Sequence, residues 1–170
     1  MSKRIMLIDA YNVIHLIPCF ADMLDVSLER ARYALVHRCT LWKQSRKDIT
    51  DFWIVFDGQS EFAGQSSGST VSGVRSIFTN TGQTADEKII EIVEYGDYNA
   101  AQYTVVSNDN FVINNSKSLG AKVISVQEFQ SEAFHHQSGT SSGVRHENEK
   151  KISSRDAKDI NNWLSKELGL

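Results

Sequence analysis

Short apolar segments alternate with helix-like segments along most of this chain, and this alternation is the strongest constraint on its fold. Each apolar segment has the length of a strand and is followed by turn residues or by residues with helical spacing. The expected strands are residues 4–8, 51–56, 74–78, 103–106 and 122–126. Strands separated by helices pair in parallel and are covered on both faces. The sequence therefore predicts an α/β fold with a central parallel sheet of about five strands and helices on both faces.

The segments between these strands carry helix and loop signals. Helices are predicted over residues 27–47, 84–96, 110–119 and 127–135. The second of them begins with Thr84-Ala-Asp-Glu87, a capping box in which a threonine hydroxyl and a glutamate bind free amides of the first turn. Residues 9–12 are predicted to be a turn after the first strand, and residues 59–73 a flexible loop rich in glycine and serine.

The length of 170 residues suits a single domain. Residues 1–136 carry the strand and helix pattern and form the predicted domain. Residues 137–152 include a polar Gly/Ser-rich run and are predicted to be a flexible linker. Residues 153–170 are predicted to form a helical tail, in which Ile160, Trp163 and Leu164 are apolar.

Composition excludes several classes of protein. No apolar run approaches the roughly 18 residues of a membrane span, so no membrane partner is expected. The charged start Met1-Ser2-Lys3-Arg4 leads into only a short apolar run, unlike a secretory signal. A cytoplasmic protein is therefore expected. Cys19 and Cys39 form no CxxC pair, which argues against a zinc site or a disulfide framework.

An aspartate stands after each of the first four predicted strands. Asp9, Asp57 and Asp109 follow strands directly or closely, and Asp86 opens the helix after the third strand. Ligands of open parallel sheets bind where the strands end, so four carboxylates are expected to gather there. Crowded carboxylates raise one another's pKa, and a divalent cation relieves that conflict. The pattern predicts a site for one or two Mg²⁺ or Mn²⁺ ions, with substrate phosphate completing the ligand shell.

Each of these aspartates also has an ordinary structural explanation. Asp57-Gly58 is a common turn pair, Asp9 can be a turn residue, and Asp86 and Asp109 suit helix N-termini. All four explanations would have to hold independently, so the pattern by itself leaves both the metal site and the ordinary structural roles open. Other chemistries have less support, because the chain contains no GxGxxG, GxxxxGK[ST], HExxH or GxSxG motif. A phospho-receiver domain would need a second acid after Asp9, where Ala10 stands.

Five segments share their order and spacing with a known family. They are Leu7-Ile-Asp-Ala-Tyr-Asn-Val-Ile14, Val55-Phe-Asp57, Ile77-Phe-Thr79, Thr84-Ala-Asp-Glu-Lys-Ile89 and Val105-Val-Ser-Asn-Asp109. Together they resemble the successive motifs of the YacP-like NYN domains, a branch of the PIN-like nucleases. The likeness spans roughly residues 3–134. It implies a Rossmann-like, three-layer PIN/NYN fold and a metal-dependent endoribonuclease that hydrolyses phosphodiester bonds of mainly single-stranded RNA.

The resemblance also assigns roles to individual residues. It implies metal ligands at Asp9, Asp57, Asp86 and Asp109, with Asp9, Asp86 and Asp109 as the catalytic core. It implies supporting roles for Asn12, which orients Asp9 or contacts phosphate, for Ser107, which positions Asp109 or a metal-bound water, and for Glu87. A metal-activated water would attack the phosphodiester in line and leave a 5′-phosphate and a 3′-hydroxyl.

Charge is unevenly distributed along the chain. The formal net charge of −3 argues against a protein wrapped in DNA by bulk charge, but residues 27–47 are strongly basic and residues 51–110 acidic. The candidates for RNA binding on the predicted 27–47 helix are Arg30, Arg32, Arg38, Lys43 and Arg46. At 3.6 residues per turn they cannot all share one face, so a subset is expected to contact the RNA backbone. Tyr11 is a candidate for base stacking, with packing as the alternative.

Two functions stay open from the sequence. The alternative to a nuclease is a non-catalytic RNA- or ribosome-binding module that keeps the fold, although such a module gains nothing from an unneutralised acidic cluster. The resemblance also raises the ribosome or translating mRNA as a partner, but no motif identifies a surface for it. The chain departs from the family at Asn108, Asn110 and Phe111, which bears on substrate choice more than on metal binding.

Overall fold

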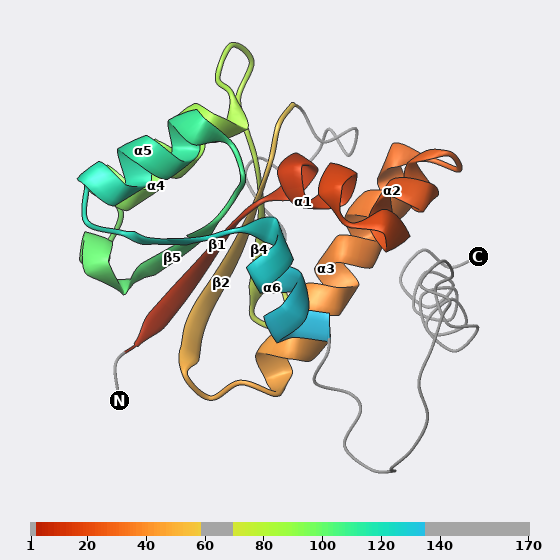
Figure 1. Cartoon of the computed structure of the whole chain (residues 1–170), viewed down its shortest axis with the longest axis horizontal. Coiled ribbons are helices and arrows are strands. Elements are labelled where there is room, and N and C mark those ends of the chain that lie inside the picture. Colours follow the sequence, from red (N-terminus) through yellow and green to blue (C-terminus); the bar gives the residue numbers. More distant parts are fainter. Residues whose placement is uncertain (1–2, 59–69, 135–170) are drawn as a thin grey trace.

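A computed structural model describes residues 3–58 and 70–134, and a six-stranded sheet runs through its centre (Figure 1). The strands are β1 (Arg4–Asp9), β2 (Ile49–Phe56), β3 (Thr70–Val71), β4 (Val74–Phe78), β5 (Tyr103–Val106) and β6 (Lys122–Ile124). Their order across the sheet is β3-β4-β2-β1-β5-β6. All neighbours pair in parallel except β3 and β4. The predicted parallel sheet of five strands is confirmed, with one short antiparallel strand added at its edge.

The added strand β3 corrects the prediction of a loop over residues 59–73. Thr70 and Val71 pair with the start of β4 through a two-residue turn. Both turn residues, Ser72 and Gly73, have positive φ angles of 47° and 82°. Positive φ at both central positions defines the tight hairpin turn that matches strand twist. Residues 59–69 lie outside the described part of the chain.

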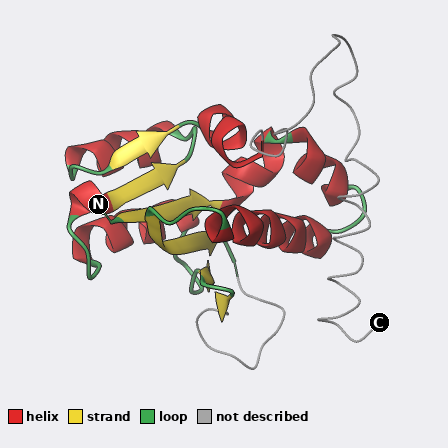
Figure 2. Cartoon of the chain, turned by 90° about the horizontal axis from the view of Figure 1, so that it is seen from below, coloured by secondary structure: helices red, strands yellow, loops and turns green. Residues whose placement is uncertain are grey.

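Helices cover both faces of the sheet (Figure 2). They are α1 (Ala10–Leu16), α2 (Pro18–Leu24), α3 (Leu28–Gln44), α4 (Ala85–Tyr95), α5 (Asn110–Ser118) and α6 (Val126–Phe134), with a short 3₁₀ turn η1 (Ala100–Gln102). One face carries α1, α2, α3 and α6, and the other carries α4 and α5. Side chains of β1 alternate between the two cores, because Met6 and Ile8 face the first core while Ile5 and Leu7 face the second. This is the predicted three-layer arrangement.

Helix α1 corrects the prediction of a turn over residues 9–12, and α2 lies where the sequence predicted no element. Asp9 is both the last residue of β1 and the N-cap of α1. Its Oδ1 accepts a hydrogen bond of 3.3 Å from the Asn12 amide. Aspartate is a favoured N-cap, and the same residue type also favours turns, so the local sequence did not separate the two. Pro18 then starts α2 at a position where proline is tolerated.

Two helix starts show how local hydrogen bonds define the boundaries. The predicted capping box at α4 is present, because Thr84 Oγ1 accepts from the Glu87 amide and Glu87 Oε2 accepts from the Thr84 amide. Helix α6 begins one residue before its predicted start, since Ser125 and Glu128 form a similar reciprocal pair ahead of it. The other predicted helices agree with α3 and α5 within a few residues at each end.

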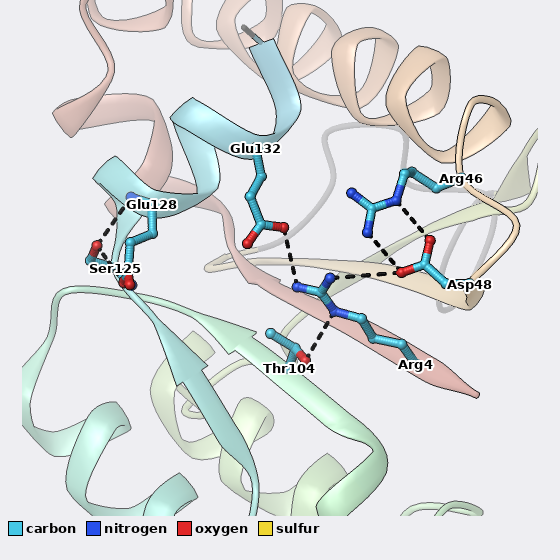
Figure 3. A network of polar contacts seen from close by, with 7 residues as sticks. All are labelled: Arg4, Arg46, Asp48, Thr104, Ser125, Glu128 and Glu132. Carbon is cyan, nitrogen blue, oxygen red and sulfur yellow. Dashed lines mark hydrogen bonds and ion pairs between the residues drawn. The ribbon is translucent and has the colours of Figure 1, made fainter. Parts of the chain in front are cut away.

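A polar network ties together the amino edge of the sheet, the edge at which the parallel strands begin (Figure 3). Arg4, the first residue of β1, contacts Asp48 at 3.8 Å and Glu132 of α6 at 3.4 Å. Its Nε also donates to Thr104 Oγ1 of β5 at 3.3 Å. Arg46 forms two hydrogen bonds of 2.7 Å with the same Asp48 carboxylate. The end of α3 therefore lies at this edge.

The predicted linker at 137–152 and the predicted helical tail at 153–170 lie outside the described residues. Within 3–58 and 70–134, no helix has the length and apolar character needed to cross a bilayer.

Candidate active site

The four predicted metal-binding aspartates come to the carboxyl edge of the sheet, the edge at which the parallel strands end. Asp9 ends β1, Asp57 follows β2, Asp109 lies between β5 and α5, and Asp86 lies in the first turn of α4. The strands concerned are neighbours in the order β4-β2-β1-β5. The carboxylates of Asp86 and Asp109 are close enough to Asp9 for their negative charges to raise its pKa.

Asp9 is the most deeply placed of these acids. Only 5% of its surface is exposed. Burial raises the pKa of its carboxyl from 3.8 to about 6, and the charges of Asp86 and Asp109 push it in the same direction. Hydrogen bonds from Ser107 and from the Asn12 amide oppose the rise without cancelling it. An ionised Asp9 is therefore held in an unfavourable setting that a cation would relieve.

A chain of hydrogen bonds orients Asp9 and the loop after β5. The buried Ser107 hydroxyl donates to Asp9 Oδ2 at 2.8 Å and accepts from the Asp109 amide at 3.0 Å. Asn12 Oδ1 accepts from the Asn108 amide at 2.7 Å. Ser107 thus connects Asp9 with Asp109, and Asn12 connects Asp9 with Asn108, the residue before Asp109. The positioning roles of the two residues stay a prediction.

The remaining acids are anchored through one oxygen or through none. Asp109 Oδ1 caps α5 by accepting from the Phe111 and Val112 amides at 2.8 and 3.1 Å. Asp57 Oδ1 accepts from the hydroxyl of the buried Thr79 at 3.2 Å. Within the described part of the chain, Oδ2 of both residues and the whole carboxylate of Asp86 have no hydrogen-bond donor.

Asp86 has a raised pKa, first because of burial and then because of the nearby charges of Asp109, Asp57 and Glu87. The Glu87 side chain itself is engaged in the capping box of α4. Its carboxylate therefore contributes charge to the site while serving the helix end.

This donor set suits a hard divalent cation such as Mg²⁺ or Mn²⁺. All the groups are oxygen donors, and no lysine or arginine of the described residues forms an ion pair with any of the four aspartates. Within those same residues, no three acidic, histidine or cysteine side chains converge closely enough to hold an ion by themselves. Mg²⁺ commonly binds through one or two carboxylates and keeps several waters, so pairs of these acids suffice as ligands.

The predicted RNA-binding residues spread along α3 and the turn that follows it. Arg30 and Arg32 lie in its first turns, near the carboxyl edge. Arg38 lies near its middle, with its guanidinium 5.0 Å from the Phe134 ring centroid. Lys43 lies beside Gly73 in the hairpin, and Arg46 belongs to the network at the amino edge. The six residues of β1 separate that edge from Asp9 by about 17 Å, so the structure does not bring Lys43 and Arg46 to the aspartates.

Four contacts of the site were absent from the residue roles predicted from the sequence. Thr79 binds both Asp57 and the Gly58 amide, the latter at 2.9 Å. Asn108 links the loop to α6, because its Oδ1 accepts from the Val126 amide and its Nδ2 donates to Gln127. Thr79 and Asn108 belong to the segments that resemble the YacP-like NYN domains, but nothing in their local sequence indicates these long-range partners.

A Rossmann-like sheet with acids at its carboxyl edge is the arrangement expected of a PIN-like fold, and the comparisons with known proteins agree. The YacP-like NYN domain family matches residues 6–168, and the chain belongs to this family. The family is nuclease-like, within the PIN-like ribonucleases, and RNA is the partner that it suggests.

Solved structures of Rae1 (YacP) from Bacillus subtilis are similar to this chain. A mutant of that protein is 28% identical, with a TM-score of 0.62, over 76% of this chain and 74% of the other. A second structure, described without a mutation, is 22% identical, with a TM-score of 0.60 over 97% and 84%, and it supports the fold alone. None of the curated proteins matches the chain.

Proposed function

We propose that this protein is a metal-dependent endoribonuclease that hydrolyses phosphodiester bonds in mainly single-stranded RNA. The observation that supports it best is the buried Asp9, whose pKa is raised to about 6 by burial and by the neighbouring Asp86 and Asp109. A structural N-cap needs neither burial nor acidic neighbours, because an exposed aspartate caps a helix equally well. The cost of this arrangement is explained if the site takes up a cation.

Individual residues of the site have different roles in the proposed reaction. Of Asp9, Asp86 and Asp109, two would bind the ion directly and the third through a water, and Asp57 would bind it directly or through a water. Mg²⁺ or Mn²⁺ bound there supplies a water of lowered pKa and offsets negative charge on the phosphodiester. Ser107 keeps the Asp9 carboxylate in one orientation through its 2.8 Å hydrogen bond. The expected products carry a 5′-phosphate and a 3′-hydroxyl.

The test incubates the purified protein with end-labelled single-stranded RNA in Mn²⁺, in Mg²⁺ and in EDTA. The expected result is internal cleavage that requires metal and that Asp9→Asn abolishes. Asp97→Asn is the matched control, since it removes the same charge from an exposed residue beyond the far end of α4. It should cleave as the parent does.

Two results would contradict the proposal. Cleavage by Asp9→Asn at the parental rate, in preparations free of contaminating nuclease, would rule out the carboxylate site as the catalyst. RNA binding without cleavage in any metal would indicate a non-catalytic binding module.

A further inference from the structure

An arginine stacked among aromatic rings lies beside the aspartates. The Arg32 guanidinium carbon is 5.6 Å from the Tyr11 ring centroid, 5.9 Å from that of Phe56 and 5.6 Å from that of Phe78. Its Nε donates to the Tyr11 hydroxyl at 2.9 Å, and its Nη2 donates to the same oxygen. Phe56 and Phe78 stack on each other with centroids 5.1 Å apart. We refer to these four residues as the Arg32 cluster.

The Arg32 cluster belongs to the same carboxyl edge as the acids. Phe56 immediately precedes Asp57, and Tyr11 stands two residues after Asp9. Phe78, at the end of β4, precedes the threonine that binds Asp57. The cluster therefore continues the row of aspartates across β2 and β4, on the face of the sheet that α3 covers.

The Arg32 guanidinium is held in place by the rings and the hydroxyl around it. No acidic side chain in residues 3–58 and 70–134 forms an ion pair with it. A guanidinium has five N–H donors, and the Tyr11 hydroxyl takes only two of them. The rings and the hydroxyl order a long side chain in advance, which lowers the entropy cost of binding an anion.

We propose that Arg32 binds a backbone phosphate of single-stranded RNA next to the cleavage site, with Tyr11, Phe56 and Phe78 holding its guanidinium. The inference rests on the proposed function and names the residue that brings RNA to the acids. A row of carboxylates repels a polyanion, so a fixed cation at its border is needed for close approach. The guanidinium fork matches phosphate oxygens. Lys43 and Arg46, at the other end of α3, are too far from the acids for this task.

The experiment measures binding of a short fluorescent oligouridine to the full chain in EDTA, as a function of salt concentration. Arg32→Gln should weaken binding about tenfold at low salt and reduce the slope of log K against log salt by about 0.7, the value for one phosphate contact on a single strand. Arg32→Lys should keep the parental slope but bind several-fold more weakly, because lysine lacks the fork.

The control is Arg75→Gln. Arg75 also stacks on an aromatic ring, that of Trp53 at 5.4 Å, but it lies three residues before Phe78 on β4 and against the other core. Its loss should leave affinity and slope close to the parental values. Equal effects of Arg32→Gln and Arg75→Gln would overturn the inference, because they would show only a general charge effect.

The inference can fail separately from the proposed nuclease activity, because binding is measured without metal. Parental affinity and slope in a folded Arg32→Gln protein would overturn it, whether or not the parent cleaves RNA. A parent protein that fails to bind oligouridine at low salt would also overturn it. If Arg32→Gln does not fold, the test uses the Arg32→Lys protein instead. Oligouridine binding by Arg32→Lys with full parental affinity would overturn the inference.

Discussion

Replacing Asp9 by asparagine removes the charge from the most buried acid of the site and keeps its shape. Asparagine still offers an oxygen to the Asn12 amide and is as good an N-cap as aspartate. The Ser107 hydroxyl, which now donates to Asp9 Oδ2, can rotate to accept from the new amide. The variant thus isolates the cost of ionising Asp9 in the folded protein.

The size of that cost follows from the pKa of Asp9, which is raised from 3.8 to about 6. At 1.36 kcal/mol per pH unit, ionisation in the folded state costs about 3 kcal/mol more than in the unfolded chain. The folded protein binds this proton more tightly, so the protonated form contributes its full stability below pH 3.8. That contribution is lost as the pH rises through about 6.

We therefore expect Asp9→Asn to be about 1–3 kcal/mol more stable than the parent at pH 7 without metal. Near pH 4 the two proteins should have similar free energies of unfolding. The assay is urea denaturation between these pH values in EDTA, repeated with Mn²⁺. A bound ion stabilises the folded state by mass action, so Mn²⁺ should stabilise the parent and the Asp97→Asn control but much less the Asp9→Asn variant.

Two results would refute this reasoning. The first is an Asp9→Asn protein that is less stable than the parent at pH 7 in EDTA. The second is a difference in unfolding free energy that does not change with pH. Either would mean that burial and the neighbouring charges do not disfavour the ionised carboxylate.

Three further changes test other parts of the structure. Ser107→Ala should destabilise the fold by about 1–3 kcal/mol in urea denaturation, because it strips a buried acceptor of its donor. It should also raise the pKa of Asp9 further and move the acid limb of the cleavage–pH profile to higher pH, since the Ser107 hydrogen bond lowers that pKa. Thr84→Ala removes the capping box of α4 and should cost about 0.5–2 kcal/mol by the same assay. Phe129→Ala removes a fully buried ring whose centroid lies 5.5 Å from that of the Trp42 ring. It should lower the unfolding free energy by about 3–5 kcal/mol.

Most of the fold could be predicted because its elements carry strong local signals. The run at Asp51–Phe56, for example, is apolar on both faces of a central strand, and Thr84 and Glu87 mark a helix start within four residues. Helix α1 could not be separated from a turn, because Asp9 suits both. Strand β3 was missed because two residues are too short for any periodicity.

The site could be predicted only in part. The sequence predicted that Asp9, Asp57, Asp86 and Asp109 share one edge of the sheet, because each stands after a strand and the strands pair in parallel. Their individual environments were not identifiable. The burial of Asp9 and the donors of Ser107 and Thr79 come from segments distant in the chain, and no local pattern encodes them.

The sequence alone determined the alternation of strands and helices, the resemblance to the YacP-like NYN domains and the edge at which the acids meet. These properties depend on residue spacing along single segments and on the general geometry of parallel sheets. Only the tertiary structure decided which cation of α3 accompanies the acids. Helix α3 runs from the carboxyl edge to the amino edge, so Arg32 lies among Tyr11, Phe56 and Phe78, while Arg46, in the turn after the helix, lies beside Asp48. Equal charges in one basic segment thereby acquire different neighbours, which their sequence context does not distinguish.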